Sequence, residues 1–280
     1  MNSRKTYPVV LSIAGSDSSG GAGIQADLKT FSALGVYGAT AITAITAQNT
    51  QGVHSQEAIT PQMVYDQIVA VIEDLHPSFI KIGMLSNAEI VTAVATALRR
   101  YSLPIILDPV IVSSSGHRLL YIDAQEVIKQ LLLPISMLIT PNIPEMAALT
   151  GKAITTYEEK EQAAKHLFGY GVKAILLKGG HEEGQTKSDI LFVNSASEIQ
   201  STIFSAESIK TRNIHGTGCT LSAAITAYMA RGCNLEQAIS EAKNFITQAI
   251  RNGADVEVGA GFGPVNHGFN PLKMLINDSE

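Results

Sequence analysis

The stretch VVLSIAGSDSSGGAGIQADLKTFSALGVYGATAITAITA, residues 9–47, decides the fold. Its uninterrupted apolar run over residues 9–14 predicts a buried strand. Apolar side chains then recur at helical spacing over residues 24–34, and Gly35 follows as a helix stop. A second apolar run over residues 37–47 predicts another strand. A strand, a helix and a strand at this spacing indicate a βαβ unit with parallel strands.

The same alternation continues along most of the chain. Further strands are expected at residues 79–83, 105–107, 137–139 and 174–177, with helices that start near residues 61, 87, 123 and 156. Past residue 188 the pattern changes to two antiparallel strands, 190–194 and 201–209, and then to helices over 217–231 and 235–252. We expect one α/β domain over residues 1–280, with a mostly parallel central sheet and an antiparallel edge.

Composition excludes several classes of protein. The chain has 280 residues, of which 45% are hydrophobic and 16% are charged, so a disordered or fibrous chain is excluded. The chain has 20 basic and 25 acidic residues, which gives a net charge of -5. It therefore lacks the excess of basic residues that is typical of a nucleic-acid-binding protein. No apolar run is long enough to predict a membrane span. The two cysteines, Cys219 and Cys233, form no disulfide framework or metal pattern and predict a reducing cytoplasm.

Polar residues and glycines gather directly after the expected strands. In an open parallel sheet, ligands bind at the carboxyl ends of the strands. The segments concerned are residues 15–23, 48–50, 83–84, 108–110, 142–145 and 178–181. Together they predict one small-molecule site at this edge of the sheet.

The first of these loops has more than one interpretation. Residues 21–26, GAGIQA, match the dinucleotide-binding pattern between a strand and a helix. That pattern also needs an acidic residue at the end of the second strand, where this chain has Gln48, so a nicotinamide cofactor is disfavoured. Two other interpretations of this loop stay open. Its glycines allow a tight strand-to-helix turn, or the loop forms the wall of a small-molecule pocket in which Asp17 accepts a hydrogen bond. Residues 151–153, GKA, do not complete a P-loop.

Residues 213–224, NIHGTGCTLSAA, place two glycines before a helix of small apolar residues. Amides at such a helix start point at one spot, and the helix dipole favours an anion there. This arrangement suits a transferring phosphoryl group. Cys219 falls in the first turn, where we expect a lowered thiol pKa that lets it act as a base or hold a substrate hydroxyl. A glycine-rich turn with a buried cysteine is the alternative.

Three further polar residues at strand ends have two interpretations each. Asn142 and Glu145 form the pattern of a helix capping pair, and Glu145 can also hold water on Mg²⁺. Lys178, before two glycines, is either a phosphate ligand or an exposed lysine.

Assembled in order, these segments resemble the bacterial hydroxymethylpyrimidine/phosphomethylpyrimidine kinases of thiamine biosynthesis. The matching motifs are AGSDSSGGAGIQAD at 14–27, AQNT at 47–50, KIGM at 81–84, DPV at 108–110, TPN at 140–142 with Glu145, LKGGH at 177–181, HGTGC at 215–219 and GPVNH at 263–267. The similarity covers about residues 9–269, and its motifs are specific in combination rather than singly.

The family is ribokinase-like. The resemblance implies a three-layer α/β/α domain, a homodimer, and dependence on ATP and Mg²⁺, with a monovalent cation open. It implies phosphorylation of 4-amino-5-hydroxymethyl-2-methylpyrimidine and then of its monophosphate to the diphosphate.

The resemblance also implies roles for individual residues. The pyrimidine pocket would be formed by Gln48, as the partner of the aminopyrimidine, and by Gly15, Asp17, Met84 and Val110. ATP phosphates would face Asn142, Lys178, Gly179 and Gly180, and Mg²⁺ would be organised through water by Asp108 and Glu145. The anion hole would consist of Gly216, Thr217, Gly218 and Cys219. Since Cys219 stands where sugar kinases of the superfamily have a catalytic aspartate, we expect charge stabilisation to dominate and Cys219 to accept the proton late.

Three alternatives stay open. A pyridoxal kinase, or a kinase of both substrates, belongs to the same branch. A catalytically silent sensor on the same fold and a dehydrogenase are further candidates. Residues 112–120 are a candidate flap over the site.

Overall fold

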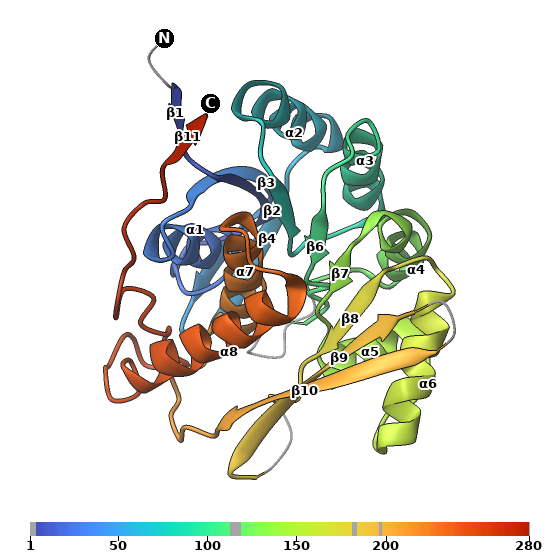
Figure 1. The fold of residues 1–280 in the computed structure, drawn as a ribbon, viewed down its shortest axis with the longest axis vertical. Coiled ribbons are helices and arrows are strands. Elements are labelled where there is room, and N and C mark those ends of the chain that lie inside the picture. The colour runs from blue at the N-terminus through green and yellow to red at the C-terminus, as the bar shows by residue number, and fades with distance from the viewer. Residues whose placement is uncertain (1–3, 113–118, 181–183, 196–197, 280) are drawn as a thin grey trace.

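The computed structural model describes residues 4–112, 119–180, 184–195 and 198–279. Within these residues, nine strands form one sheet in the order β10-β9-β8-β7-β6-β5-β2-β3-β4. Six neighbouring strands run parallel: β2 (Val9–Asp17), β3 (Tyr37–Asn49), β5 (Phe79–Ile82), β6 (Ile105–Leu107), β7 (Leu138–Ile139) and β8 (Ala174–Leu177). The parallel α/β sheet expected from the sequence is confirmed (Figure 1).

Antiparallel strands flank the parallel part on both sides. β9 (Thr186–Asn194) and β10 (Ile199–Glu207) form the expected hairpin at one edge. At the other edge, β4 (Gly52–Ala58) pairs antiparallel with β3, a strand that the sequence pattern did not predict. Its residues GVHSQEA are polar and mostly exposed, so no apolar run marks it.

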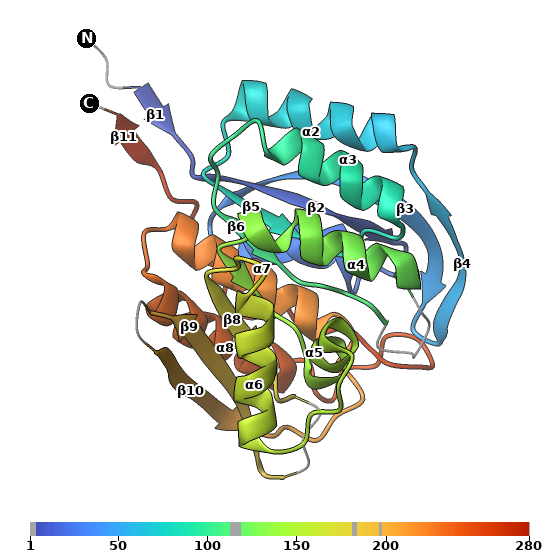
Figure 2. The same ribbon diagram turned by 90° about the vertical axis from the view of Figure 1, so that its right-hand side faces the viewer.

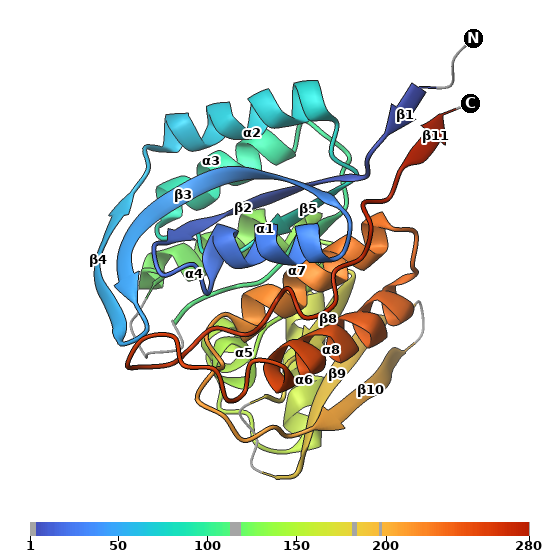
Figure 3. The ribbon, with the colours of Figure 1, turned by 90° about the vertical axis from the view of Figure 1, so that its left-hand side faces the viewer.

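Helices cover both faces of the sheet, as Figures 2 and 3 show from opposite sides. One face carries α1 (Gly23–Ala33), α7 (Thr217–Ala230) and α8 (Leu235–Arg251). The other carries α2 (Pro61–Leu75), α3 (Ala88–Leu98), α4 (Ile122–Leu131), α5 (Ile143–Thr150) and α6 (Tyr157–Phe168), with a short 3-10 turn, η1 (Leu133–Ile135). These three layers are the α/β/α arrangement implied by the resemblance.

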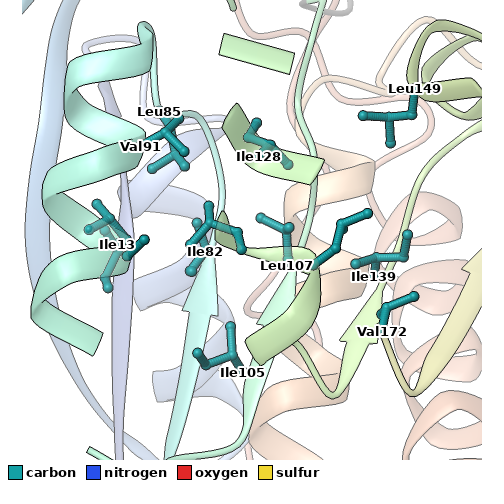
Figure 4. Packing of buried hydrophobic residues seen from close by; sticks show 14 of the residues in the cluster. Ile13, Ile82, Leu85, Val91, Ile105, Leu107, Ile128, Ile139, Leu149 and Val172 are labelled. Atoms are coloured by element: carbon teal, nitrogen blue, oxygen red, sulfur yellow. The ribbon is translucent and has the colours of Figure 1, made fainter. Parts of the chain in front are cut away.

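Two apolar cores follow from the alternation of side chains along each strand. Ile82, Leu107 and Ile139 belong to the core beneath α2 to α6, part of which Figure 4 shows. Their strand neighbours Ile106 and Leu138 belong instead to the core beneath α1, α7 and α8. Because both faces of the strands are buried, the strands read as continuous apolar runs in the sequence.

Side chains fix several helix starts as the sequence indicates. Thr60 accepts a hydrogen bond from the Met63 amide, and Asn87 accepts one from Ile90. Asn142 and Glu145 form a complete capping box at α5. Helix α7 differs, because Gly216 at its start offers no side-chain cap. The Thr217 amide donates to the Ile214 carbonyl at 3.3 Å, and the next amides, those of Gly218 and Cys219, remain for another partner.

A separate two-stranded ribbon joins the two ends of the described chain. β1 (Arg4–Thr6) pairs antiparallel with β11 (Asn277–Ser279), as Figure 1 shows. No helix in the described part of the chain is both long and apolar enough to cross a membrane.

Candidate active site

A cavity of about 570 Å³ lies at the carboxyl ends of the parallel strands. Most of the residues that the sequence predicts for the site line it: Gly15, Asp17, Gln48, Met84, Asp108, Val110, Asn142, Glu145, Lys178, Gly180, Gly216, Thr217, Gly218 and Cys219. Gly179, also predicted, does not line it. Residues far apart in the sequence thus meet in one place, because most of them lie at or just after the carboxyl ends of neighbouring strands and the others lie at the start of α7.

Asp17 organises the loop between β2 and α1. Its Oδ1 accepts hydrogen bonds from the amide and the hydroxyl of Ser19, at 2.8 and 2.7 Å. Its Oδ2 accepts from the amides of Gly21 and Ala22, at 3.1 and 2.8 Å, and lies 2.8 Å from Nε2 of His215. Burial opposes ionisation, but these hydrogen bonds outweigh it and lower the pKa of Asp17 to about 2. The carboxylate therefore holds the pocket wall in shape.

Gln48 is held from both its main chain and its side chain. Its amide donates to Oγ of Ser18, and that hydroxyl donates to the Gln48 carbonyl, both at 2.8 Å. Oε1 accepts from the Thr46 hydroxyl at 3.3 Å, and Nε2 lies 3.3 Å from Nε2 of His215. Gln48 is only partly buried and lines the cavity, so its amide is presented to a ligand in a fixed position.

Helix α7 begins against the first loop. Gly216 adopts a φ of 80°, and a Cβ at this position would lie 1.8 Å from the Gly21 carbonyl oxygen. Only glycine fits there, since a side chain would clash with the backbone and φ is left-handed. The close approach seats the uncapped amides at the start of α7 on the cavity, next to His215 and Gln48. This is the geometry of an anion site.

The expectation of a lowered thiol pKa at Cys219 is wrong. Burial raises the pKa of the Cys219 thiol to about 11, and the charge of Lys81 and the Gly23 amide only partly oppose that rise. The helix start alone predicted the opposite direction, because it ignored the loss of water around the sulfur. At neutral pH the thiol is therefore protonated.

A charged cluster lies beside the start of α7. Lys178 Nζ donates to Oδ1 of Asp108 at 2.7 Å and lies 3.8 Å from Oε2 of Glu145. Asp108 also accepts from the hydroxyls of Thr140 and Ser222, at 3.1 and 3.2 Å. A Cβ built on Gly218 would lie 3.4 Å from Lys178 Nζ, which puts the ammonium against the anion site.

The pKa values of the two carboxylates in this cluster shift in opposite directions. Asp108 is buried, but the adjacent Lys178 ammonium lowers its pKa. Burial raises the pKa of Glu145 to about 7, and Lys178 opposes this only in part. The Glu145 carboxylate also accepts the Asn142 amide at 2.8 Å, so the capping role predicted for it is confirmed.

The residues present fit a Mg²⁺ ion that arrives with a nucleotide. Two carboxylates, Asp108 and Glu145, flank Lys178 on the cavity wall. No group of three or more metal-ligating side chains occurs in the described ranges. Mg²⁺ keeps several waters and takes one or two carboxylates plus substrate phosphates, so it needs no closed protein cage.

The sequence pattern missed the pair that anchors the loop after β8. Asp189 Oδ1 accepts the Gly179 amide at 2.9 Å, and its Oδ2 accepts Lys243 Nζ at 2.6 Å. Both side chains are nearly buried, they join β9 to α8, and they line the same cavity as Lys178 and Gly180. The sequence signal for Asp189 was its position directly before the apolar run at residues 190–193. Residues 113–118 of the candidate flap, and His181, lie outside the described residues.

Comparison with known proteins agrees with this geometry. The family model described as phosphomethylpyrimidine kinase matches residues 17–266. A hydroxymethylpyrimidine/phosphomethylpyrimidine kinase from Rhizobium meliloti is 49% identical over 260 residues, covering 92% of this chain and 96% of that protein. The corresponding Bacillus subtilis kinase is 44% identical over 259 residues, covering 92% and 93%.

Solved structures of two kinds resemble the fold. The crystal structure of phosphomethylpyrimidine kinase from Clostridium difficile has a TM-score of 0.74 at 42% identity, covering 86% of this chain and 99% of that one. An ADP complex of Bacillus subtilis pyridoxal kinase has a TM-score of 0.84 at 33% identity, covering 94% and 98%. With its model matched over most of the sequence and relatives near half identity, this chain belongs to the phosphomethylpyrimidine kinase family.

Proposed function

We propose that this chain transfers the γ-phosphoryl group of ATP to the hydroxymethyl group of 4-amino-5-hydroxymethyl-2-methylpyrimidine, and then phosphorylates the monophosphate. One observation carries the proposal: Gln48 and the start of α7 line the same cavity, and His215 joins them at 3.3 Å from Gln48 Nε2. An alcohol held over Gln48 is thus close to an anion site suited to a phosphoryl group.

The substrate end of the cavity suits an aminopyrimidine. The Gln48 amide offers a donor and an acceptor on one plane, which complements an amino group next to a ring nitrogen. Met84 and Val110 supply apolar walls, and Gly15 leaves room beside them. Because Ser18 and Thr46 fix Gln48, binding needs little reordering of the protein.

The phosphate end is assigned to the cluster around Lys178. Lys178 with Gly180 and Asn142 would face the phosphates, and Asp108 and Glu145 would hold Mg²⁺ through water. When bound, Mg²⁺ neutralises phosphate charge. The amides of Gly218 and Cys219 would stabilise the charge that develops on the transferring group. Asp189 would keep Gly179 and its neighbours in place through the hydrogen bond to the Gly179 amide.

A protonated Cys219 fits a positioning role better than that of a resident base. With its pKa near 11, the thiol carries its proton at neutral pH and cannot accept another. It lines the cavity at the third residue of α7, where it can hold the reacting hydroxyl. A loose transition state needs little early deprotonation of the alcohol, so its proton leaves late, to an oxygen of the transferred phosphoryl group.

Pyridoxal phosphorylation is the second candidate. The structural likeness to pyridoxal kinases favours it, since their TM-scores of 0.83 to 0.84 exceed that of the pyrimidine kinase from Clostridium difficile. Sequence identity points the other way, at 39 to 49% for the pyrimidine kinases against 30 to 33%. The homodimer, the cytoplasmic location and the monovalent cation stay predictions.

Steady-state rates decide between the two substrates. We expect phosphorylation of the pyrimidine alcohol with ATP and Mg²⁺ at a kcat/KM at least tenfold above that for pyridoxal, with the products identified by mass spectrometry. Gln48→Ala should reduce kcat/KM for the pyrimidine and spare the KM for ATP. A preference for pyridoxal would reverse the assignment, and no ATP consumption with either alcohol would overturn it.

A further inference from the structure

A buried ion pair lies beneath the site and outside the cavity wall. Lys81 Nζ in β5 lies 2.9 Å from Oδ2 of Asp27 in α1, and both side chains are completely buried. The same oxygen accepts the hydroxyl of Ser12, from β2, at 2.6 Å. None of these three residues lines the cavity, so substrate binding does not explain them.

Stability does not explain the pair either. Removing two charges from water costs more than their attraction usually returns, and apolar replacements of buried ion pairs are often neutral or stabilising. The pair is also incompletely bonded, because Oδ1 of Asp27 has no hydrogen-bond partner. The neighbours of Lys81 in the strand are the buried apolar residues Ile80 and Ile82. A charge kept in such surroundings calls for a functional reason.

The position of the ammonium supplies that reason. A Cβ built on Gly83, the first residue after β5, would lie 2.8 Å from Lys81 Nζ and 3.1 Å from Cβ of Ala14, so the ammonium lies under the strand ends that carry the site. Helix α7 packs directly on α1 and β5, the two elements that hold the pair. The Gly23 amide, at the start of α1, favours the charged form of the Cys219 thiol and so opposes the rise of its pKa.

The charges that act on the Cys219 sulfur come from every element packed around it. Lys81 of β5 favours negative charge at the sulfur, whereas Asp27 of α1 and Asp108 after β6 oppose it. Lys178, after β8, also interacts with the sulfur. Lys178 and Asp108 line the cavity, whereas Lys81 and Asp27 do not and lie outside its wall.

We propose that Lys81, clamped by Asp27 and Ser12, is a positioning residue whose fixed positive charge supports the negative charge that gathers at the start of α7, beside the Cys219 thiol, during phosphoryl transfer. The inference rests on the proposed function in placing the reacting alcohol at Cys219. The charge acts from outside the cavity on the helix start, and Lys81 does not contact the substrate, while the Cys219 thiol serves as a reporter of that charge. A fixed charge in a water-poor site costs no reorganisation when the reaction occurs.

The reactivity of the thiol tests the proposal without any turnover. The chain has two cysteines, so a Cys233→Ala background leaves Cys219 as the only site of alkylation. The rate of alkylation by iodoacetamide is measured against pH in that background and in Lys81→Met. Below its pKa, the thiolate fraction changes tenfold per pKa unit, so we expect Lys81→Met to slow alkylation by about tenfold or more at a fixed pH.

Two further variants complete the design. Lys81→Gln keeps a donor for Asp27 and serves if Lys81→Met does not fold, as judged by thermal melting. Lys129→Met is the matched control, because it removes another nearly buried lysine that pairs with a carboxylate, here Glu126, and that does not line the cavity. We expect it to leave the alkylation profile of Cys219 unchanged.

Kinetics with the pyrimidine alcohol add a second readout. We expect the Lys81 variants to lower kcat by about tenfold or more while leaving the KM for ATP unchanged. An unchanged alkylation profile in a folded Lys81 variant overturns the inference even if the wild type is an active kinase. A slowed alkylation in a chain that phosphorylates neither alcohol leaves the electrostatic link intact and removes the proposed function.

Discussion

His215 Nε2 lies 2.8 Å from Oδ2 of Asp17 and thereby connects the loop before α7 to the loop after β2. Both side chains are nearly buried, and Gln48 Nε2 lies 3.3 Å from the same ring nitrogen. The contact links the part of the cavity at Gln48 to the start of α7. Five separate hydrogen-bond donors or ring contacts converge on Asp17, so the two loops form one unit.

Loss of the His215 ring should separate the two loops. We expect His215→Ala to lower the free energy of unfolding by about 1–3 kcal/mol, because it leaves a buried carboxylate short of a partner. We also expect kcat/KM for the pyrimidine to fall about tenfold or more, since Gln48 loses its neighbour. Urea unfolding and steady-state kinetics measure the two effects. His54→Ala, at an exposed position in β4, is the control and should change neither.

Lowering the pH should reduce the free energy of unfolding, in part because Asp17 becomes protonated. Its pKa falls from 3.8 to about 2 on folding, so its contribution is complete above about pH 4 and is lost as the pH drops through 2. We expect that contribution to be about 2 kcal/mol. Unfolding free energies of the wild type and Asp17→Asn between pH 2 and 5 should therefore converge toward the acid end. A constant gap across that range would contradict the assignment.

Glu145 should show the opposite pH dependence. Its pKa rises to about 7 on folding, so proton binding by the folded state contributes stability that is complete below about pH 4.5 and is lost as the pH rises through 7. We expect Glu145→Gln, which can still cap α5, to be more stable than the wild type at pH 8 by about 1–3 kcal/mol. We expect the same variant to lose kinase activity with Mg²⁺-ATP. A variant both less stable and fully active would refute both expectations.

Cys219 should matter for turnover and little for nucleotide binding. We expect Cys219→Ala to reduce kcat about 10- to 100-fold, because the reacting hydroxyl loses its partner, and to leave the affinity for ATP unchanged. Cys219→Ser restores a hydrogen-bonding group and should recover part of the rate. Calorimetric titration with ATP and steady-state rates separate the two properties, and Cys233→Ala should behave as the wild type. Unchanged turnover in Cys219→Ala would discard the positioning role.

Gly216→Ala should disrupt the anion site. Its new Cβ would fall 1.8 Å from the Gly21 carbonyl oxygen, so the start of α7 must move away from the first loop. We expect at least tenfold loss of kcat and a destabilisation of about 2 kcal/mol or more. Gly232→Ala is the matched control, since Gly232 also has a left-handed φ, of 95°, but open space around it. It should cost about 1 kcal/mol of strain and keep the activity.

Much of the site could be predicted because parallel strands bring their ends together. Asp17, Gln48, Asp108 and Lys178 each follow an apolar run, and a common edge of the sheet needs no knowledge of side-chain packing. The pairings could not be predicted in this way. Lys81 meets Asp27, and Lys243 meets Asp189, only because helices fold back onto particular strands.

The strand β4 was not predicted, and the direction of the Cys219 pKa shift was predicted wrongly. The strand β4 has a polar sequence because an exposed edge strand needs no apolar run, so periodicity could not reveal it. The direction of the Cys219 pKa depends on how completely neighbouring elements remove water from the sulfur. Neither exposure nor desolvation is a property of nearby residues in the sequence.

The ribbon of β1 and β11 has a practical consequence for handling the protein. It adjoins the amino end of β2, whereas the cavity adjoins the carboxyl end of that nine-residue strand, about 30 Å away. A tag or a surface tether attached there should leave ligand access intact. Since Arg4 pairs directly with Ser279, a short glycine linker across that pair could join the ends, and new termini could be opened at a loop elsewhere to give a circular permutant.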